Sequence, residues 1–149
     1  MKKIILLFVM TVLCQCLLAQ SNLHISPVFE HISDYGKDTK TVWVKGKELR
    51  KYKLTLYRSI STENSQIAGN MEKAVIADSK KAVDKEIGYI GSRLYYAFLS
   101  LPPEAAGQDF MRFIFYRNPS LKNNSKKEVT LVYMEGRITM SELKNLFKK

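Results

Sequence analysis

The chain has 149 residues, of which 46% are hydrophobic and 26% charged. These fractions are typical of a globular protein and exclude a disordered or collagen-like one, and the length fits one domain. Lys and Arg outnumber Asp and Glu by 24 to 14, which gives a formal net charge of +10. Two cysteines are too few for a disulfide scaffold.

The first twenty residues have the pattern of a secretory signal peptide. Two lysines near the start precede an apolar run, and small Ala19 precedes polar Gln20. A membrane span needs about twenty apolar residues, more than this run offers. We predict that residues 1–19 are cleaved off and that residues 20–149 form one exported domain, periplasmic or secreted.

Two alternatives for this leader are a lipoprotein signal and an uncleaved anchor. Cys14 and Cys16 lie near the end of the apolar run, but Leu13 and Gln15 precede them, where lipid attachment favours a small residue. We therefore favour simple cleavage. Cleavage removes both cysteines and two lysines, so the mature chain has a net charge of +8. Without a thiol, thiol-based catalysis and Cys-ligated metals are excluded.

Helix and strand signals alternate along the first half of the mature chain. The patterns predict a short helix over 23–32, with Ser26 as its cap. They then predict strands over 41–45 and 49–60, which follow each other closely enough to form a hairpin. Asn64 begins a helical stretch with one apolar stripe.

The strand predicted over 49–60 has the clearest alternation. Its apolar positions are Tyr52, Leu54, Leu56 and Ile60, and mostly polar residues lie between them. A period of two predicts that these four side chains share the core face and that the other face is wet.

The helical stretch 64–87 fits either one long kinked helix or two helices. In the second interpretation, Asp78 or Ser79 caps a helix that carries Ala82, Val83 and Ile87.

Three strands and a helix complete the chain. The strands are predicted over 93–101, 110–117 and 128–135. Thr139 lies three residues before Glu142, which is the spacing of a capping box and predicts a helix start.

The grouping of these elements predicts an α+β fold. Short connections favour a mainly antiparallel sheet of about five strands, with the helices packed on one face. The order is helix, two strands, helical stretch, three strands and helix. The other face of the sheet would then be exposed.

The residues that support catalysis or metal binding are sparse. His24 and His31 are seven residues apart, about 10 Å along a helix, too far to share one metal ion. The sequence has no nucleophile elbow and no Gly-rich phosphate loop. We therefore predict no metal, no cofactor and a non-enzymatic protein. The alternative is a small envelope hydrolase or inhibitor with a cleft near Glu135 and His31.

Positive charge is concentrated in the predicted hairpin. Residues 37–58 contain eight Lys or Arg and two Asp or Glu, which is +6 of the mature +8. We predict that the hairpin and the exposed sheet face bind an envelope protein or an anionic glycan or lipid surface. Nucleic acid is disfavoured by the leader. The predicted binding residues are Lys45, Lys47, Arg50, Lys51, Lys53 and Tyr57. The alternative is a solvated edge whose lysines discourage aggregation.

Several runs of the mature chain resemble a family of small exported bacterial proteins described as a domain of unknown function. These runs are PVFE from Pro27, YKLTLYRS from Tyr52, Tyr95-Tyr96, FIFY from Phe113 and VTLVYMEG from Val129. The resemblance implies an envelope location and a one-domain α+β fold. It implies no reaction and no site residues.

Overall fold

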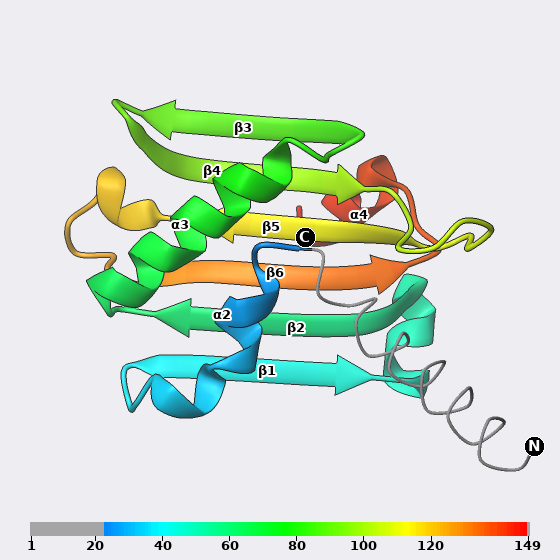
Figure 1. Ribbon diagram of the computed structural model, residues 1–149, viewed down its shortest axis with the longest axis horizontal. Helices are drawn as coiled ribbons and strands as arrows, with labels where there is room; N and C mark the ends of the chain where they lie inside the picture. The colour runs from blue at the N-terminus through cyan, green and yellow to red at the C-terminus, as the bar shows by residue number, and fades with distance from the viewer. Residues whose placement is uncertain (1–22, 149) are drawn as a thin grey trace, which may run out of the picture.

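The computed structural model describes residues 23–148. The predicted leader and both cysteines lie outside these residues. Each strand is bounded as follows: β1 Thr39–Lys45, β2 Leu54–Thr62, β3 Asp84–Ile90, β4 Arg93–Leu101, β5 Met111–Arg117 and β6 Val129–Gly136. They form one antiparallel sheet in the order β1-β2-β6-β5-β4-β3, so β1 and β3 are its two edges (Figure 1).

Helices cover both faces of this sheet. The α-helices are α2 Ser26–Glu30, α3 Ser65–Ser79 and α4 Met140–Phe147, and the short 3-10 helices are η2 Ile32–Asp34, η3 Lys47–Tyr52 and η4 Pro119–Leu121. Helices α2 and α3 lie on one face, and α4 lies on the other (Figure 1). No helix of residues 23–148 has the length and apolar character that a membrane crossing requires.

Alternate side chains of the central strands enter two separate cores. In β5, for example, Ile114 and Tyr116 belong to the core under α2 and α3, whereas Phe113 belongs to the core under α4. The second core also contains Met140 and Leu143 of α4. The predicted α+β fold with an antiparallel sheet is therefore confirmed. The sheet has six strands, and the apolar face of α4 covers the side that was expected to be exposed.

The helix starts predicted at Asn64 and Thr139 are confirmed. The Asn64 side chain accepts hydrogen bonds from the N–H groups of Gln66 and Ile67 and so begins α3. Thr139 and Glu142 form the predicted capping box of α4, with each side chain bonded to the backbone N–H of the other. Such caps satisfy N–H groups that a helix cannot pair internally.

The first helix is shorter than predicted, and Ser26 does not cap it. Helix α2 begins at Ser26, and its N-cap position is Ile25, which makes no side-chain cap. The N–H groups of His24 and Ile25 instead donate to the carboxylate of Asp78 on α3, at 2.8 and 3.0 Å. A long-range partner thus takes the place of the local cap.

The strand predicted over 49–60 begins five residues late. Its first part is the 3-10 helix η3, which buries Leu49 and ends at Lys53 in the left-handed conformation, with φ 57°. A register shift then follows between Leu54 and Leu56. As a result Leu54 enters the core under α4 and Ile60 enters the core under α2 and α3, so the prediction of one shared face is wrong.

The prediction of a helix beyond Asp78 is also wrong. Helix α3 continues to Ser79, and the chain then forms edge strand β3, which pairs with β4. The N–H of Val83 donates to the carbonyl of Ser100 at 2.8 Å and starts this pairing. Asp78 caps nothing because its carboxylate binds the segment before α2.

Candidate functional site

A cleft of about 290 Å³ opens at one end of the sheet, on the face that α2 and α3 cover. At this end β1, β4 and β6 finish and β2 and β5 begin (Figure 1). Strand ends from four neighbouring strands therefore bring their side chains to the same place.

Two rows of facing side chains form the floor of the cleft. The first row crosses three strands, because Trp43 faces Arg58 and Arg58 faces Tyr133. Residues directly opposite each other on antiparallel strands project to the same side, with Cβ atoms about 5 Å apart. This row therefore presents an indole, a guanidinium and a phenol side by side.

The second row lies one step closer to the end of the sheet. Lys45 faces Leu56, Leu56 faces Glu135, and Glu135 faces Arg112. All four residues line the cleft. The row therefore carries both signs of charge on the side of the sheet that elsewhere forms the core.

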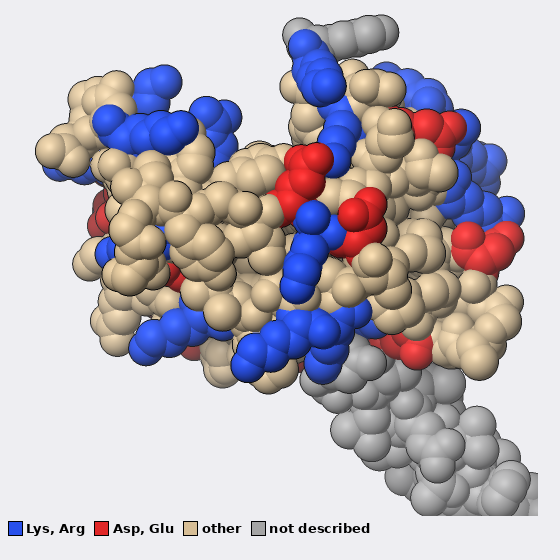
Figure 2. All heavy atoms as spheres, turned by 90° about the horizontal axis from the view of Figure 1, so that it is seen from above, with Lys and Arg blue, Asp and Glu red and all other residues tan. Residues whose placement is uncertain are grey.

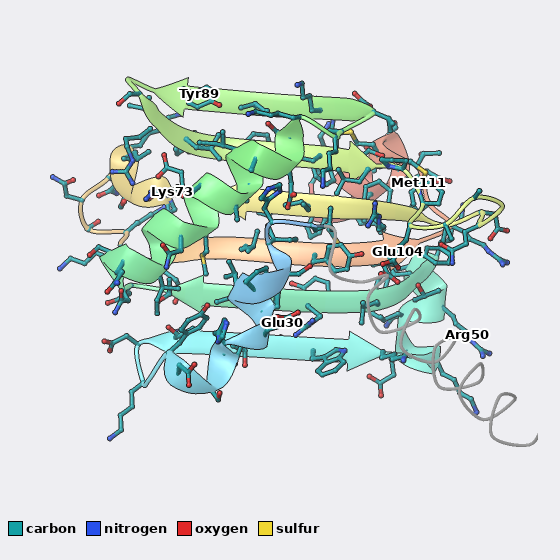
Figure 3. The ribbon with its side chains drawn as sticks, in the orientation of Figure 1. Glu30, Arg50, Lys73, Tyr89, Glu104 and Met111 are labelled. Carbon is teal, nitrogen blue, oxygen red and sulfur yellow. The ribbon has the colours of Figure 1, made fainter. Side chains whose placement is uncertain are left out.

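Two further segments make the walls. Helix α2 contributes Phe29 and Glu30, and the connection from β4 to β5 contributes Glu104. Figure 3 shows Glu30 on α2 and Glu104 near the end of the sheet, on the same side of it.

Arg58 lies between two aromatic rings. Its Cζ atom is 4.7 Å from the centroid of the Phe29 ring and 4.8 Å from that of Trp43, and its Nη2 donates to the Phe29 carbonyl at 3.4 Å. Burial lowers the pKa of Arg58, and the nearby Glu30 carboxylate opposes that shift. The guanidinium remains a cation, so the two rings hold a positive charge by cation–π attraction.

Tyr133 and Glu135 are neighbours on the same face of β6. The Tyr133 hydroxyl donates to Glu135 Oε1 at 2.8 Å. Burial, with the negative charge of Glu135, raises the pKa of Tyr133 far above its usual range. The phenol therefore keeps its proton and serves as a donor to the carboxylate.

Glu104 and Arg112 are two further charged residues of the cleft lining. Arg112 is only 5% exposed, and its Nε donates to the Pro102 carbonyl at 2.9 Å. Burial raises the pKa of Glu104; Arg112 opposes this shift and Glu135 adds to it. Glu104 Oε1 is buried with no hydrogen-bond partner in the structure. An unpaired buried acceptor costs about 1–3 kcal/mol, so its presence calls for an explanation.

The residues predicted to bind do not share one surface. Lys45 lines the cleft, but Tyr57 packs against the core on the opposite face, and Lys53 Nζ pairs with Glu142 at 2.7 Å. The other three, Lys47, Arg50 and Lys51, are exposed on η3, and Figure 3 shows Arg50 beside the outer ends of β1 and β2.

Basic side chains are also abundant on other parts of the surface. Seen from the β3 edge, Lys and Arg occupy several separate areas rather than one patch (Figure 2).

The two predicted acid–base residues are not brought together. Glu135 lines the cleft, but His31 is not part of its lining and lies with its Nδ1 3.4 Å from the Asp34 carboxylate. Within the described part of the chain, no group of three or more His, Cys, Asp or Glu could hold a metal ion.

The sequence prediction missed most residues of the cleft, among them Trp43, Arg58, Glu104, Arg112 and Tyr133. A signal was available in the strand periodicity. Arg58 is two residues from buried Ile60, and Arg112 is two residues from buried Ile114. Residues two apart on a strand project to the same face of the sheet. Charged residues at these two positions therefore indicate a polar region on a face that otherwise forms the core.

Of the comparisons with known proteins, only the one with family profiles gave a match. Comparison with curated proteins gave no match, and comparison with solved structures gave none. The sequence profile of the family of unknown function DUF6108 matches residues 12–147, nearly the whole chain. The chain therefore belongs to the DUF6108 family.

Proposed function

We propose that this protein is an exported, non-enzymatic binding module that takes a small polar ligand in the cleft at the end of the sheet. The observation that carries the proposal is the buried, unpartnered Oε1 of Glu104 beside Arg112 in that cleft. Perturbed ionisable groups in a concave site are typical of functional positions.

A purely structural role explains these residues poorly. Further from the end of the sheet, the same face carries apolar residues at matching positions, such as Ile60, Ile114 and Leu131. Placing Arg112 at 5% exposure has a desolvation cost that an apolar side chain would avoid. A ligand that hydrogen-bonds to these groups gives a reason to keep them.

Export is the second part of the proposal. It is supported by the sequence alone, from the basic start, the apolar run and the small residue at Ala19. Residues 20–149 contain no cysteine, so the domain needs no particular redox environment.

Ligand binding in the cleft can be measured by tryptophan fluorescence. Trp43 is the single tryptophan and lines the cleft with 68% exposure. We expect its fluorescence to change saturably with at least one compound from a panel of sugars, amino acids, carboxylates and amines. Arg112→Met should weaken that binding, because it removes the buried positive charge of the cleft.

The matched control is Arg137→Met, at an exposed arginine outside the cleft lining, whose Nε pairs with Asp109 at 3.0 Å. This variant should bind as the unmodified chain does. A panel in which no compound changes Trp43 fluorescence, or binding that survives Arg112→Met in a folded variant, would overturn the assignment of the cleft.

A second candidate is hydrolysis of the bound compound. The specific observation in its favour is that Glu104, whose pKa is raised by burial, shares the cleft with Glu135. A carboxyl group with a raised pKa can act as a general acid beside an ionised carboxylate. Conversion of a bound compound that stops in Glu104→Gln, with binding retained, would establish this activity; binding without conversion excludes it.

A further inference from the structure

We propose that the ligand of the cleft is a neutral saccharide and that Trp43 packs against its ring. This inference rests on the proposed binding function and names the chemical class of the ligand. It follows from the charge balance of the cleft, from its mixture of donors and acceptors, and from the exposed indole.

The charges that line the cleft balance. Its cations are Lys45, Arg58 and Arg112, and its carboxylates are Glu30, Glu104 and Glu135. They are also interspersed: Glu30 acts on Arg58, and Arg112 acts on Glu104. An ion of either sign would meet a neighbour of its own sign and would gain little net attraction. A neutral ligand has no such conflict.

The polar groups nevertheless offer many hydrogen bonds of both kinds. Carboxylates only accept, and guanidinium and ammonium groups only donate. A hydroxyl group does both, so a ligand with several adjacent hydroxyl groups can satisfy both sets at once. Among neutral compounds, sugars have this arrangement on a compact ring.

Trp43 supplies the apolar contact that such a ring needs. Its side chain is 68% exposed although it stands beside the cleft and in the same row as Arg58 and Tyr133. The C–H face of a sugar ring can cover part of this exposed indole, which removes apolar surface from water.

The volume of the cleft limits the size of the ligand. About 290 Å³ lies just below the range for small-molecule sites, which begins near 300 Å³. A monosaccharide, or the terminal unit of a longer glycan, fits this space. A chain of several enclosed sugar units does not.

The experiment is calorimetric titration of the full chain with glucose, galactose and N-acetylglucosamine, and with glutamate and putrescine as charged probes. We expect saturable binding of a neutral sugar with an affinity that changes little between low and high salt, because no net charge is involved. Each sugar is tested both free and as the terminal unit of an oligosaccharide, which distinguishes a soluble ligand from a glycan end.

Trp43→Ala should weaken the sugar affinity by about tenfold, the size expected for loss of an aromatic contact. Tyr89→Ala is the matched control, since Tyr89 is 52% exposed on β3 and lies outside the cleft lining. Circular dichroism shows whether both variants keep the fold.

The outcomes separate the two proposals. Binding of glutamate or putrescine in the cleft, with no neutral sugar bound, overturns the saccharide inference and leaves the binding function standing. Sugar binding that is unchanged in Trp43→Ala also overturns the inference. A cleft that binds none of the probes and none of the wider panel overturns both.

Discussion

Asp78, near the end of α3, binds His24 through both backbone and side chain. Its Oδ1 lies 2.8 Å from the His24 backbone N and 2.9 Å from the ring Nδ1, while its Oδ2 accepts from the N–H of Ile25. The Asp78 side chain is fully buried. These bonds fasten the segment before α2 to the helix that covers the sheet, and α2 forms one wall of the cleft.

Asp78→Asn should therefore destabilise the protein by about 3 kcal/mol, since an amide group replaces one acceptor oxygen with a donor that faces N–H groups. Urea denaturation measures the loss. Asp38→Asn is the control, because Asp38 is exposed in the turn before β1 and should have little effect. Equal midpoints for the two variants would contradict this account of α2.

Glu142 predicts a pH dependence of stability. Its hydrogen bond from Lys53, with those from Thr139, lowers the pKa of the Glu142 carboxyl from 4.5 to about 2. Because the folded-state pKa is the lower one, the ionised carboxylate stabilises the fold fully above pH 4.5, and this contribution is lost as the pH falls toward 2.

Glu142→Gln should therefore lower Tm at neutral pH, and its difference from the unmodified chain should shrink steadily toward pH 2. Melting curves at a series of pH values measure this. High salt should reduce the effect, because the Lys53 and Glu142 side chains are 59% and 46% exposed. If the difference in Tm did not change with pH, ionisation of Glu142 would not contribute to the stability of the fold.

Gly136 predicts a steric effect at the end of β6. A Cβ at this position would lie 2.3 Å from the Lys53 carbonyl oxygen and 2.9 Å from Leu54 Cα, both of them backbone atoms. The same carbonyl accepts from Arg137 N–H at 2.9 Å, so the two strands cannot separate without losing a bond. Gly136→Ala should cost about 1–3 kcal/mol in chemical denaturation.

Gly69→Ala is the matched control for this prediction. Gly69 lies within α3, and a Cβ there would meet no atom within 4 Å. Alanine favours a helix interior over glycine by about 1 kcal/mol, so this variant should be more stable than the unmodified chain. Similar effects of the two substitutions would argue against a close approach at Gly136.

The basic residues of η3 give a prediction that is independent of the cleft. Lys47, Arg50 and Lys51 are exposed on one 3-10 helix, which suits contact with an anionic surface. We expect the protein to bind vesicles that contain phosphatidylglycerol at low salt and to be released at high salt. Reversal of all three charges to Glu should abolish this binding, while vesicles of phosphatidylcholine alone should bind neither form.

Most of the elements could be predicted from the sequence because their signals are local. Asn64 and the pair Thr139 and Glu142 begin their helices through bonds that span three residues at most. The β3 edge strand was missed because its side chains are largely exposed, so Asp84 and Glu86 produce no alternation of buried and wet positions.

The cleft could not be predicted in the same way because it depends on strand register. Trp43, Arg58 and Tyr133 come from three strands and meet only because β1, β2 and β6 pair as they do. The register shift after Leu54 decides which side of β2 faces the cleft. No local sequence pattern predicts this shift. Of the residues that the sequence singles out, two line the cleft: Lys45, from the basic hairpin, and Glu135, at the end of a recognisable strand.

The two unpaired edges of the sheet have a consequence for how the protein behaves at high concentration. Because the chain covers both sheet faces itself, strand addition along an edge is the remaining route to growth into a fibre. At one edge Asp84, Lys85 and Glu86 are exposed, followed by a bulge at Gly88 and Tyr89; at the other, Lys40 and Lys45 are exposed on β1. A second molecule approaching either edge in register would have to bury these charges, so self-polymerisation is opposed at both margins.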